Sequence, residues 1–364
     1  MSSTVTIHHL RSTDPARQVC VSGIGLLTPI GLHAPQCFAS MRAGIARFEE
    51  TENYYCQASD EELAESQPLV WSRVQTLAAE PGPQRIAALA AEAVSDLLDR
   101  TPLRRRDLDR LACIPVLPRP LGRDLLQDIE ARTGIAMRPG SGAIHETEAG
   151  FPLAVEQACT AILEGAIDAC VVVAADSFLE SGLLDQLDAS GHLKSARNLD
   201  GFIPGEGAAA IMLETRARAE ARMTGAMAVI EAVASGLEPE PPGSPNPTSG
   251  DGLVEILNQL NEELEDLALP EWAIVTLNGT SRPAREWGAV LSRMLPSLQL
   301  GEIWYPTESL GHCGVAAAAI GFALAAYAMR EKQAPHPSGL LAALGSDARR
   351  GVLIFSRAHA SPAT

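Results

Sequence analysis

The sequence has few basic residues, few aromatic residues and no long apolar segment. Its 364 residues include 28 Lys and Arg against 45 Asp and Glu, which gives a formal charge of −17. Proteins that bind nucleic acids or anionic membrane surfaces usually present a basic face. The charge balance therefore argues against a nucleic acid and against a membrane as partners.

No segment has the character of a targeting or membrane-spanning sequence. The longest apolar run, residues 315–329, is rich in alanine and too short to cross a bilayer. The first 18 residues contain no apolar run of the kind that a signal peptide requires. We therefore expect a cytoplasmic protein in which residues 311–330 form a buried helix.

The seven cysteines are odd in number and include no Cys-x-x-Cys pair, so neither a disulfide framework nor a zinc site is expected. Glycines at 205 and 207 flank Glu206, but no Lys-Ser/Thr pair follows them, which argues against a phosphate loop. We expect a tight turn here, with Glu206 binding backbone amides. The sequence thus predicts no metal and no cofactor.

What the sequence does contain is a globular composition, with 46% hydrophobic and 20% charged residues. Apolar β-branched runs alternate with segments of helical periodicity, which predicts an α/β fold with mainly parallel strands. The expected strands cover 18–30, 111–116 (ended by Pro115 and Pro118), 167–175, 208–213, 226–234, 273–277 and 351–356. The expected helices cover 83–99, 101–110, 152–165, 253–267 and 311–330.

Two irregular segments indicate how the chain is organised. Residues 46–80 are polar and acidic, and we expect them to form a surface excursion. Residues 237–251, LEPEPPGSPNPTSGD, are rich in Pro, Gly and Ser, which is typical of a long loop between structural units. We therefore expect an N-terminal half over 1–236 and a C-terminal half over 237–364.

Several segments, in order along most of the chain, resemble the β-ketoacyl-acyl-carrier-protein synthases of the thiolase superfamily. Residues 200–210, DGFIPGEGAAA, carry the most specific likeness, because several glycines and an acid recur at fixed spacing. The others are VCVSGIGLLTPIG at 19–31, EGAIDACVVVAADS at 164–177, NGTS at 278–281 and GHCGVAAA at 311–318. The resemblance implies a five-layered αβαβα fold of two similar halves, in proteins that are usually dimers.

The resemblance also implies where a nucleophile would stand. In these synthases a cysteine thiolate holds the acyl chain at the N-terminus of a buried helix, where the helix dipole lowers its pKa. The corresponding stretch is AIHETEAGFPLA at 143–154, and the nucleophile position falls on Glu148 or on Thr147, depending on how the glycine is matched. Neither is a cysteine, and we expect the nearest one, Cys159, to lie inside the following helix.

The other chemical positions that the resemblance implies are also changed. The first catalytic histidine corresponds to Asn278 and the lysine before the second histidine to Glu308, so that only His312 remains. The glycine-rich loop that supplies an oxyanion-hole amide is replaced by GSDARRG at 345–351, although the strand that follows is kept. We therefore expect no catalytic residue among these degenerate positions, and a pseudoenzyme that acts by binding.

Two binding roles and one enzymatic role stay open. The chain resembles a chain-length factor, the partner of an active ketosynthase, and thiolase-like proteins without a nucleophile also accompany type VI secretion effectors as adaptors. The alternative is a diverged acyltransferase or hydrolase, in which Asn278 and His312 polarise a carbonyl while Glu148 or His145 activates water. The arginines at 104, 105, 106 and 110 are either a docking surface for an acidic acyl-carrier protein or a solvated helix face.

The region around 140–155 carries the expectations about assembly. We expect a homodimer, or a heterodimer with a ketosynthase-like protein, that covers Ile144, Phe151, Pro152 and Leu153 next to the strand at 169–174. A lone chain would then expose this apolar patch and self-associate. Phe151, Pro152 and Leu153, which stand where the family keeps small residues, are expected to narrow the acyl pocket, while Ser346 stands near the position of the gatekeeper.

Overall fold

The computed structural model describes residues 5–56, 67–104, 107, 111–118, 123–135, 144–145, 147–196, 198–263, 269–295 and 297–358. In these residues, two sets of strands and helices follow one another in the same order. The first set is β2 (Val19–Leu27), α2 (Pro83–Arg100), β5 (Leu111–Leu117), α4 (Arg123–Thr133), β6 (Ile144–His145), α5 (Gly150–Leu163), β7 (Ala169–Ser177) and β8 (Glu206–Thr215). The second set is β9 (Ala228–Leu237), α8 (Asp251–Glu263), β10 (Trp272–Val275), α9 (Ser281–Met294), β11 (Glu302–Trp304), α11 (Ala316–Arg330), β12 (Ser338–Leu344) and β13 (Arg349–Arg357).

The strand order repeats in the same way as the chain order. The first set runs β6-β5-β7-β8-β2 across its sheet and the second runs β11-β10-β12-β13-β9, with β2 and β9 joining the two. In both sets the final strand is antiparallel to its neighbours. Because β9 pairs with β13, we propose that the boundary between the halves lies before β9, earlier than the Pro-rich loop at 237–251.

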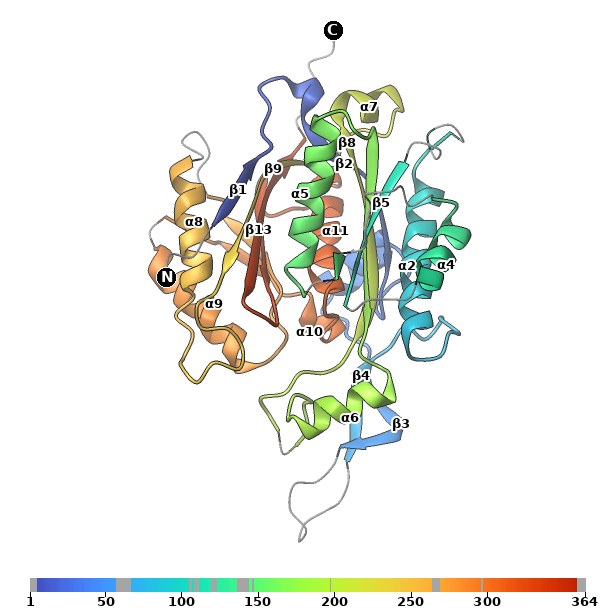
Figure 1. Cartoon of the computed structure of the whole chain (residues 1–364), viewed down its shortest axis with the longest axis vertical. Coiled ribbons are helices and arrows are strands. Elements are labelled where there is room, and N and C mark those ends of the chain that lie inside the picture. Colours follow the sequence, from blue (N-terminus) through green and yellow to red (C-terminus); the bar gives the residue numbers. More distant parts are fainter. Residues whose placement is uncertain are drawn as a thin grey trace.

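The helices divide the molecule into layers. Helices α2 and α4 cover the outer face of the first strand set, α8 and α9 cover that of the second, and α5 and α11 lie between the two (Figure 1). Separate apolar clusters fill the space beneath α2, the space beneath α8 and α9, and the central layer. The fold is therefore the five-layered αβαβα arrangement of thiolases.

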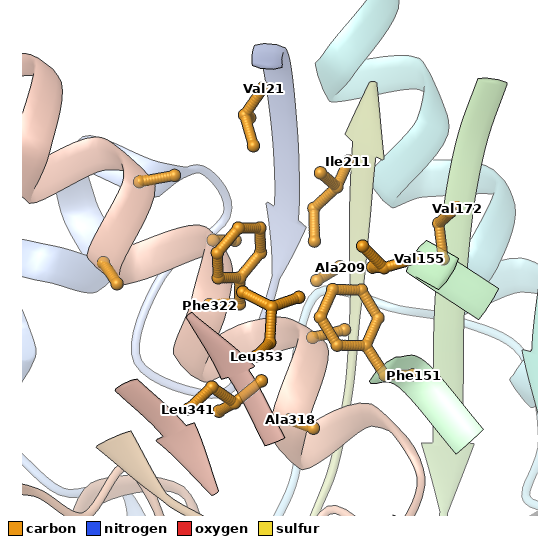
Figure 2. Packing of buried hydrophobic residues seen from close by; sticks show 14 of the residues in the cluster. Val21, Phe151, Val155, Val172, Ala209, Ile211, Ala318, Phe322, Leu341 and Leu353 are labelled. Carbon is orange, nitrogen blue, oxygen red and sulfur yellow. The ribbon is translucent and has the colours of Figure 1, made fainter. Parts of the chain in front are cut away.

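The central layer depends on small and aromatic side chains. Helix α11 is almost wholly buried, as its alanine content predicts, since small side chains let a helix approach the sheets closely. Phe322 of α11 lies 5.7 Å from Phe151 of α5 and 5.2 Å from Phe355 of β13, measured between ring centroids. Figure 2 shows residues of both halves meeting around Phe151 and Phe322.

The remaining elements are attached to this core. They are β1 (Thr6–His9), the short 3-10 helix η1 (Pro15–Arg17), α1 (Ala34–Arg42), β3 (Phe48–Cys56), β4 (Gln67–Ser72), α6 (Ser181–Ala189), α7 (Arg216–Ala221) and α10 (Thr307–Leu310). The hairpin of β3 and β4 projects with α6 at one end of the molecule (Figure 1), and the two share a small apolar core. The segment 46–80 is thus an excursion, as expected, although it contains strands.

Some sequence expectations were wrong in detail. Pro115 lies inside β5, paired in register with Val173, and does not end the strand. On the other side of β5, strand β6 pairs only with Val116 and Leu117. Pro115 therefore has no ladder partner on that side among the described residues, and a strand tolerates proline at such a position because no backbone donor is needed there. Residues 101–104 are not helical, and most of the rest of the helix expected over 101–110 lies outside the described residues.

The expectation that a lone chain exposes an apolar patch was also wrong, because most of the residues named for it are buried. Phe151 and Pro152 are buried and Ile144 is 8% exposed, because α5 packs between the two strand sets, and only Leu153 is partly exposed. The apolar strand β7 lies between β5 and β8 and has no free edge.

None of the helices in the described part of the chain has the length and apolarity needed to cross a membrane.

Candidate functional site

The turn that starts α5 is the position where the resemblance places a nucleophile. Glu148 is buried there, and its Oε2 accepts a hydrogen bond from the backbone N of Ser346 at 2.7 Å. The Thr147 hydroxyl donates to Asp347 Oδ1 at 3.1 Å. Both partners lie in the turn between β12 and β13, so this turn holds the start of α5 through polar contacts.

His312 lies next to Glu148. Its Nε2 is 3.3 Å from Glu148 Oε1, and the backbone N of His312 donates to the carbonyl of Ile203 at 2.8 Å. The imidazole stacks on Phe178 at 4.8 Å and meets the edge of Phe202 at 4.7 Å between ring centroids. The side chain is thus enclosed on several sides, and only 5% of the residue is exposed.

Burial sets the charge state of His312. It lowers the pKa of the imidazole below the ordinary value of 6.5, and the nearby Glu148 carboxylate opposes this shift without cancelling it. The imidazole is therefore neutral at pH 7. The pair is a close contact between a carboxylate and a neutral ring, rather than an ion pair.

This protonation state gives a testable pH dependence. The unfolded chain binds a proton on His312 near pH 6.5, whereas the folded chain does not, so stability is full above that pH and decreases as the pH falls toward the folded pKa. The substitution His312→Asn should reduce the difference in unfolding free energy between pH 7.5 and 5.5, by at most about 1.4 kcal/mol per pH unit.

Chemical denaturation at both pH values measures the effect. The exposed residue His192 provides the matched control, since His192→Asn removes a histidine without opening the buried site. An unchanged pH dependence in His312→Asn would mean that the imidazole titrates alike in the folded and unfolded chains.

Asn278 and Glu308 do not join this pair in a common set of contacts. The Asn278 side-chain oxygen accepts from the backbone N of Thr280 at 3.0 Å and from its hydroxyl at 2.7 Å, a local turn just before α9. Glu308 is exposed and lines a different cavity of about 370 Å³ with Tyr305 and Met41. For His145 the structure describes only the backbone, in β6.

None of the cysteines replaces the missing nucleophile. All seven are buried, and Cys159 lies inside α5 as expected. Burial raises the pKa of Cys159 and Cys313 well above the usual range of a thiol, and raises that of Cys20 and Cys37 to about 12. A thiol in such a setting does not supply a thiolate at neutral pH.

A second buried polar group lies at the glycine turn of residues 205–207, and the sequence did not indicate its main partner. Arg85 of α2 donates through Nε and Nη2 to the two carboxylate oxygens of Glu206, each at 2.6 Å, and both side chains are fully buried. Glu206 also accepts from the backbone N of Val74 and from the hydroxyl of Ser177, each at 2.8 Å. The expected amide contact is present, but the main partner is a guanidinium.

Comparisons with known proteins agree with the fold described above. Residues 149–219 match the family model of the β-ketoacyl synthase N-terminal domain. A comparison with curated protein sequences gave no match. Solved structures match 94–95% of the chain at 12–16% sequence identity.

Three of these structures show the range of the likeness. One is AntDE:AntF, a type II PKS acyl-carrier protein in complex with its ketosynthase, with a TM-score of 0.76, 15% identity, and coverage of 94% of this chain and 99% of that chain. The oxazolomycin ketosynthase domain of Streptomyces albus has a TM-score of 0.76, 16% identity, and coverage of 95% and 75%. The ishigamide ketosynthase/chain length factor has a TM-score of 0.73, 16% identity, and coverage of 94% and 99%.

These structural matches show that the chain has the fold of ketosynthases. The family match is confined to residues 149–219, which include the glycine-rich segment at 200–210.

Proposed function

We propose that this chain is a non-condensing member of the ketosynthase fold, which acts by binding another protein. The observation that carries the proposal is the contact between Glu148 and His312. A carboxylate stands at the start of α5, where a condensing enzyme needs a thiolate, and it is fixed by Ser346 and by a neutral imidazole. A carboxylate in this place cannot hold an acyl chain as a thioester.

The enclosure of His312 supports the same proposal. Stabilising the oxygen of an enolate requires hydrogen-bond donors that face an open substrate position. Here Phe178, Phe202 and Glu148 surround the imidazole. These contacts favour a structural role for the buried polar side chains, rather than the binding of a substrate oxygen.

Two kinds of partner fit a binding role. The first is a ketosynthase-like protein, for which this chain would serve as a chain-length-factor-like subunit, and an acyl-carrier protein would be a further partner. The match to a structure described as a ketosynthase/chain length factor supports this choice. The second is a secretion effector, for which the chain would act as an adaptor. Both roles would be performed in the cytoplasm, where the seven buried free cysteines stay reduced.

One observation favours a second candidate function. The Glu148 carboxylate and His312 imidazole are adjacent, as in hydrolases in which a carboxylate orients a histidine. A diverged acyltransferase or hydrolase would use this pair together with Asn278. It would require the site to open, because both side chains are buried in the structure.

The binding proposal gives a testable expectation about assembly. In the described residues, β6 pairs only with β5, so its other edge is available for a strand of a second subunit. We expect the isolated chain, of 38.4 kDa, to form a dimer through this edge. The substitution His145→Pro should yield a monomer, because proline removes a backbone donor from the edge, whereas His145→Thr should leave the dimer intact.

Light scattering coupled to size-exclusion chromatography measures the mass of each variant. A wild-type monomer, or a dimer that survives His145→Pro with unchanged affinity, would contradict association through β6. The first result would shift the proposal toward the adaptor role, in which another surface binds.

A further inference from the structure

A small cavity beside α7 is lined by three arginines. Its volume is about 180 Å³, and its walls are formed by Arg104, Asp107, Arg218, Ala221 and Arg222. Helix α7 lies at the opposite end of the strands from α10 and therefore far from His312 (Figure 1). The cavity is thus separate from the site at the start of α5.

Two of these arginines form ion pairs with carboxylates. Arg222 donates through Nη2 to Glu214 Oε1 and, at 3.4 Å, to the hydroxyl of Ser22. Arg218 Nη1 is 3.5 Å from Asp168 Oδ1. These contacts fix the guanidinium groups in place, so that they do not have to be ordered when a ligand binds.

Arg104 adds a third guanidinium group to the wall of the cavity, on an exposed residue. Arg218 and Arg222 are four residues apart, a spacing at which like charges repel on a helix. Three guanidinium groups around a small cavity favour a multiply charged anion, because guanidinium N–H groups can bond to its oxygens.

We propose that this cavity binds the phosphate group of a small phosphate monoester. The volume admits a phosphate and a few further atoms, which excludes a large ligand from the cavity itself. A planar guanidinium matches the geometry of phosphate oxygens. The inference goes beyond the proposed binding function and does not depend on it.

The acidic groups near the cavity contact its arginines. Glu214 and Asp168 are engaged with Arg222 and Arg218, and Asp107 Oδ2 accepts from the backbone N of Arg104 at 2.9 Å. Asp107 lines the cavity, and its charge opposes an anion. Phosphate binding should therefore be tightened when this carboxylate is neutralised.

Calorimetric titration with glycerol 3-phosphate and with inorganic phosphate, at matched ionic strength, tests the proposal on the full chain. Both probes should bind the wild type. The substitutions Arg104→Ala and Arg218→Ala should each weaken binding by about tenfold or more, since each removes charged hydrogen bonds. Asp107→Asn should strengthen binding several-fold. Tighter binding of glycerol 3-phosphate would identify an ester, and equal binding would identify the free ion as the ligand.

Arg330→Ala is the matched control, because Arg330 is an exposed arginine on α11 that pairs with Glu331. It should leave the affinity unchanged, and thermal unfolding in chloride confirms that each variant is folded. The proposal is overturned if the wild type binds neither probe, if Arg330→Ala weakens binding as much as Arg218→Ala, or if Asp107→Asn has no effect.

Discussion

Replacing Glu206 with glutamine is expected to lower the free energy of unfolding by about 3–5 kcal/mol, the usual effect of removing one partner of a buried ion pair. Arg85 and Glu206 are both fully buried and joined by two hydrogen bonds. Glutamine has nearly the same shape, but it leaves the Arg85 guanidinium charged and without a counter-ion in the core. The loss comes from that unpaired charge rather than from a cavity.

Chemical denaturation of Glu206→Gln against wild type measures this loss. The surface pair of Arg330 and Glu331 provides the control, because Glu331→Gln removes the same kind of charge from an exposed site and should change stability by less than about 1 kcal/mol. A loss in Glu206→Gln as small as in the control would show that Arg85 reaches water or another carboxylate.

The second large effect is expected in the central layer. Phe322→Ala should lower the free energy of unfolding by about 3–5 kcal/mol, the range for removing a large aromatic side chain from a core. Phe322 is completely buried and packs on Phe151 of the first half and on Phe355 of the second. The cavity left behind would loosen the contact between the two halves, so the unfolding transition should also broaden or divide.

Phe48→Ala is the matched control, since Phe48 is 36% exposed on the projecting hairpin. Thermal unfolding followed by circular dichroism should show a much smaller loss for this variant. If Phe322→Ala unfolds in the same single transition with less than about 1 kcal/mol of destabilisation, the central layer does not hold the halves together as the packing indicates.

The sequence predicted the long, strongly patterned elements well. Strands β2, β7 and β8 are continuous apolar runs because both of their faces are covered. Helix α2 has clear helical periodicity, and α11 is a continuous alanine-rich apolar run. Elements with short or mixed patterns were missed. Strands β6 and β11 have two and three residues, too few to show alternation. Helix α9 was also missed, although its buried Trp287, Val290 and Met294 recur at helical spacing.

The candidate site was predicted in part. The resemblance brought Glu148, Thr147 and His312 to attention, but it could not choose between the first two. Only the fold brings Glu148 to His312, since α5 and the turn before α11 are distant in sequence and adjacent across the central layer. The partner of Glu206 could not be predicted either, because Arg85 near the start of a helix is usually solvated. That the degenerate positions carry no catalysis stays a prediction.

The central claim is that this chain carries out no acyl-enzyme chemistry, and intact-mass spectrometry tests it most directly. The purified chain would be incubated with an acyl-CoA and with an acylated carrier protein, beside an active ketosynthase as positive control. We expect the mass of the chain to stay unchanged, because Glu148 cannot form a thioester and every cysteine is buried. An acyl adduct on Cys159, Cys313 or Glu148 that disappears in His312→Ala would contradict the account and establish an acyl-processing enzyme.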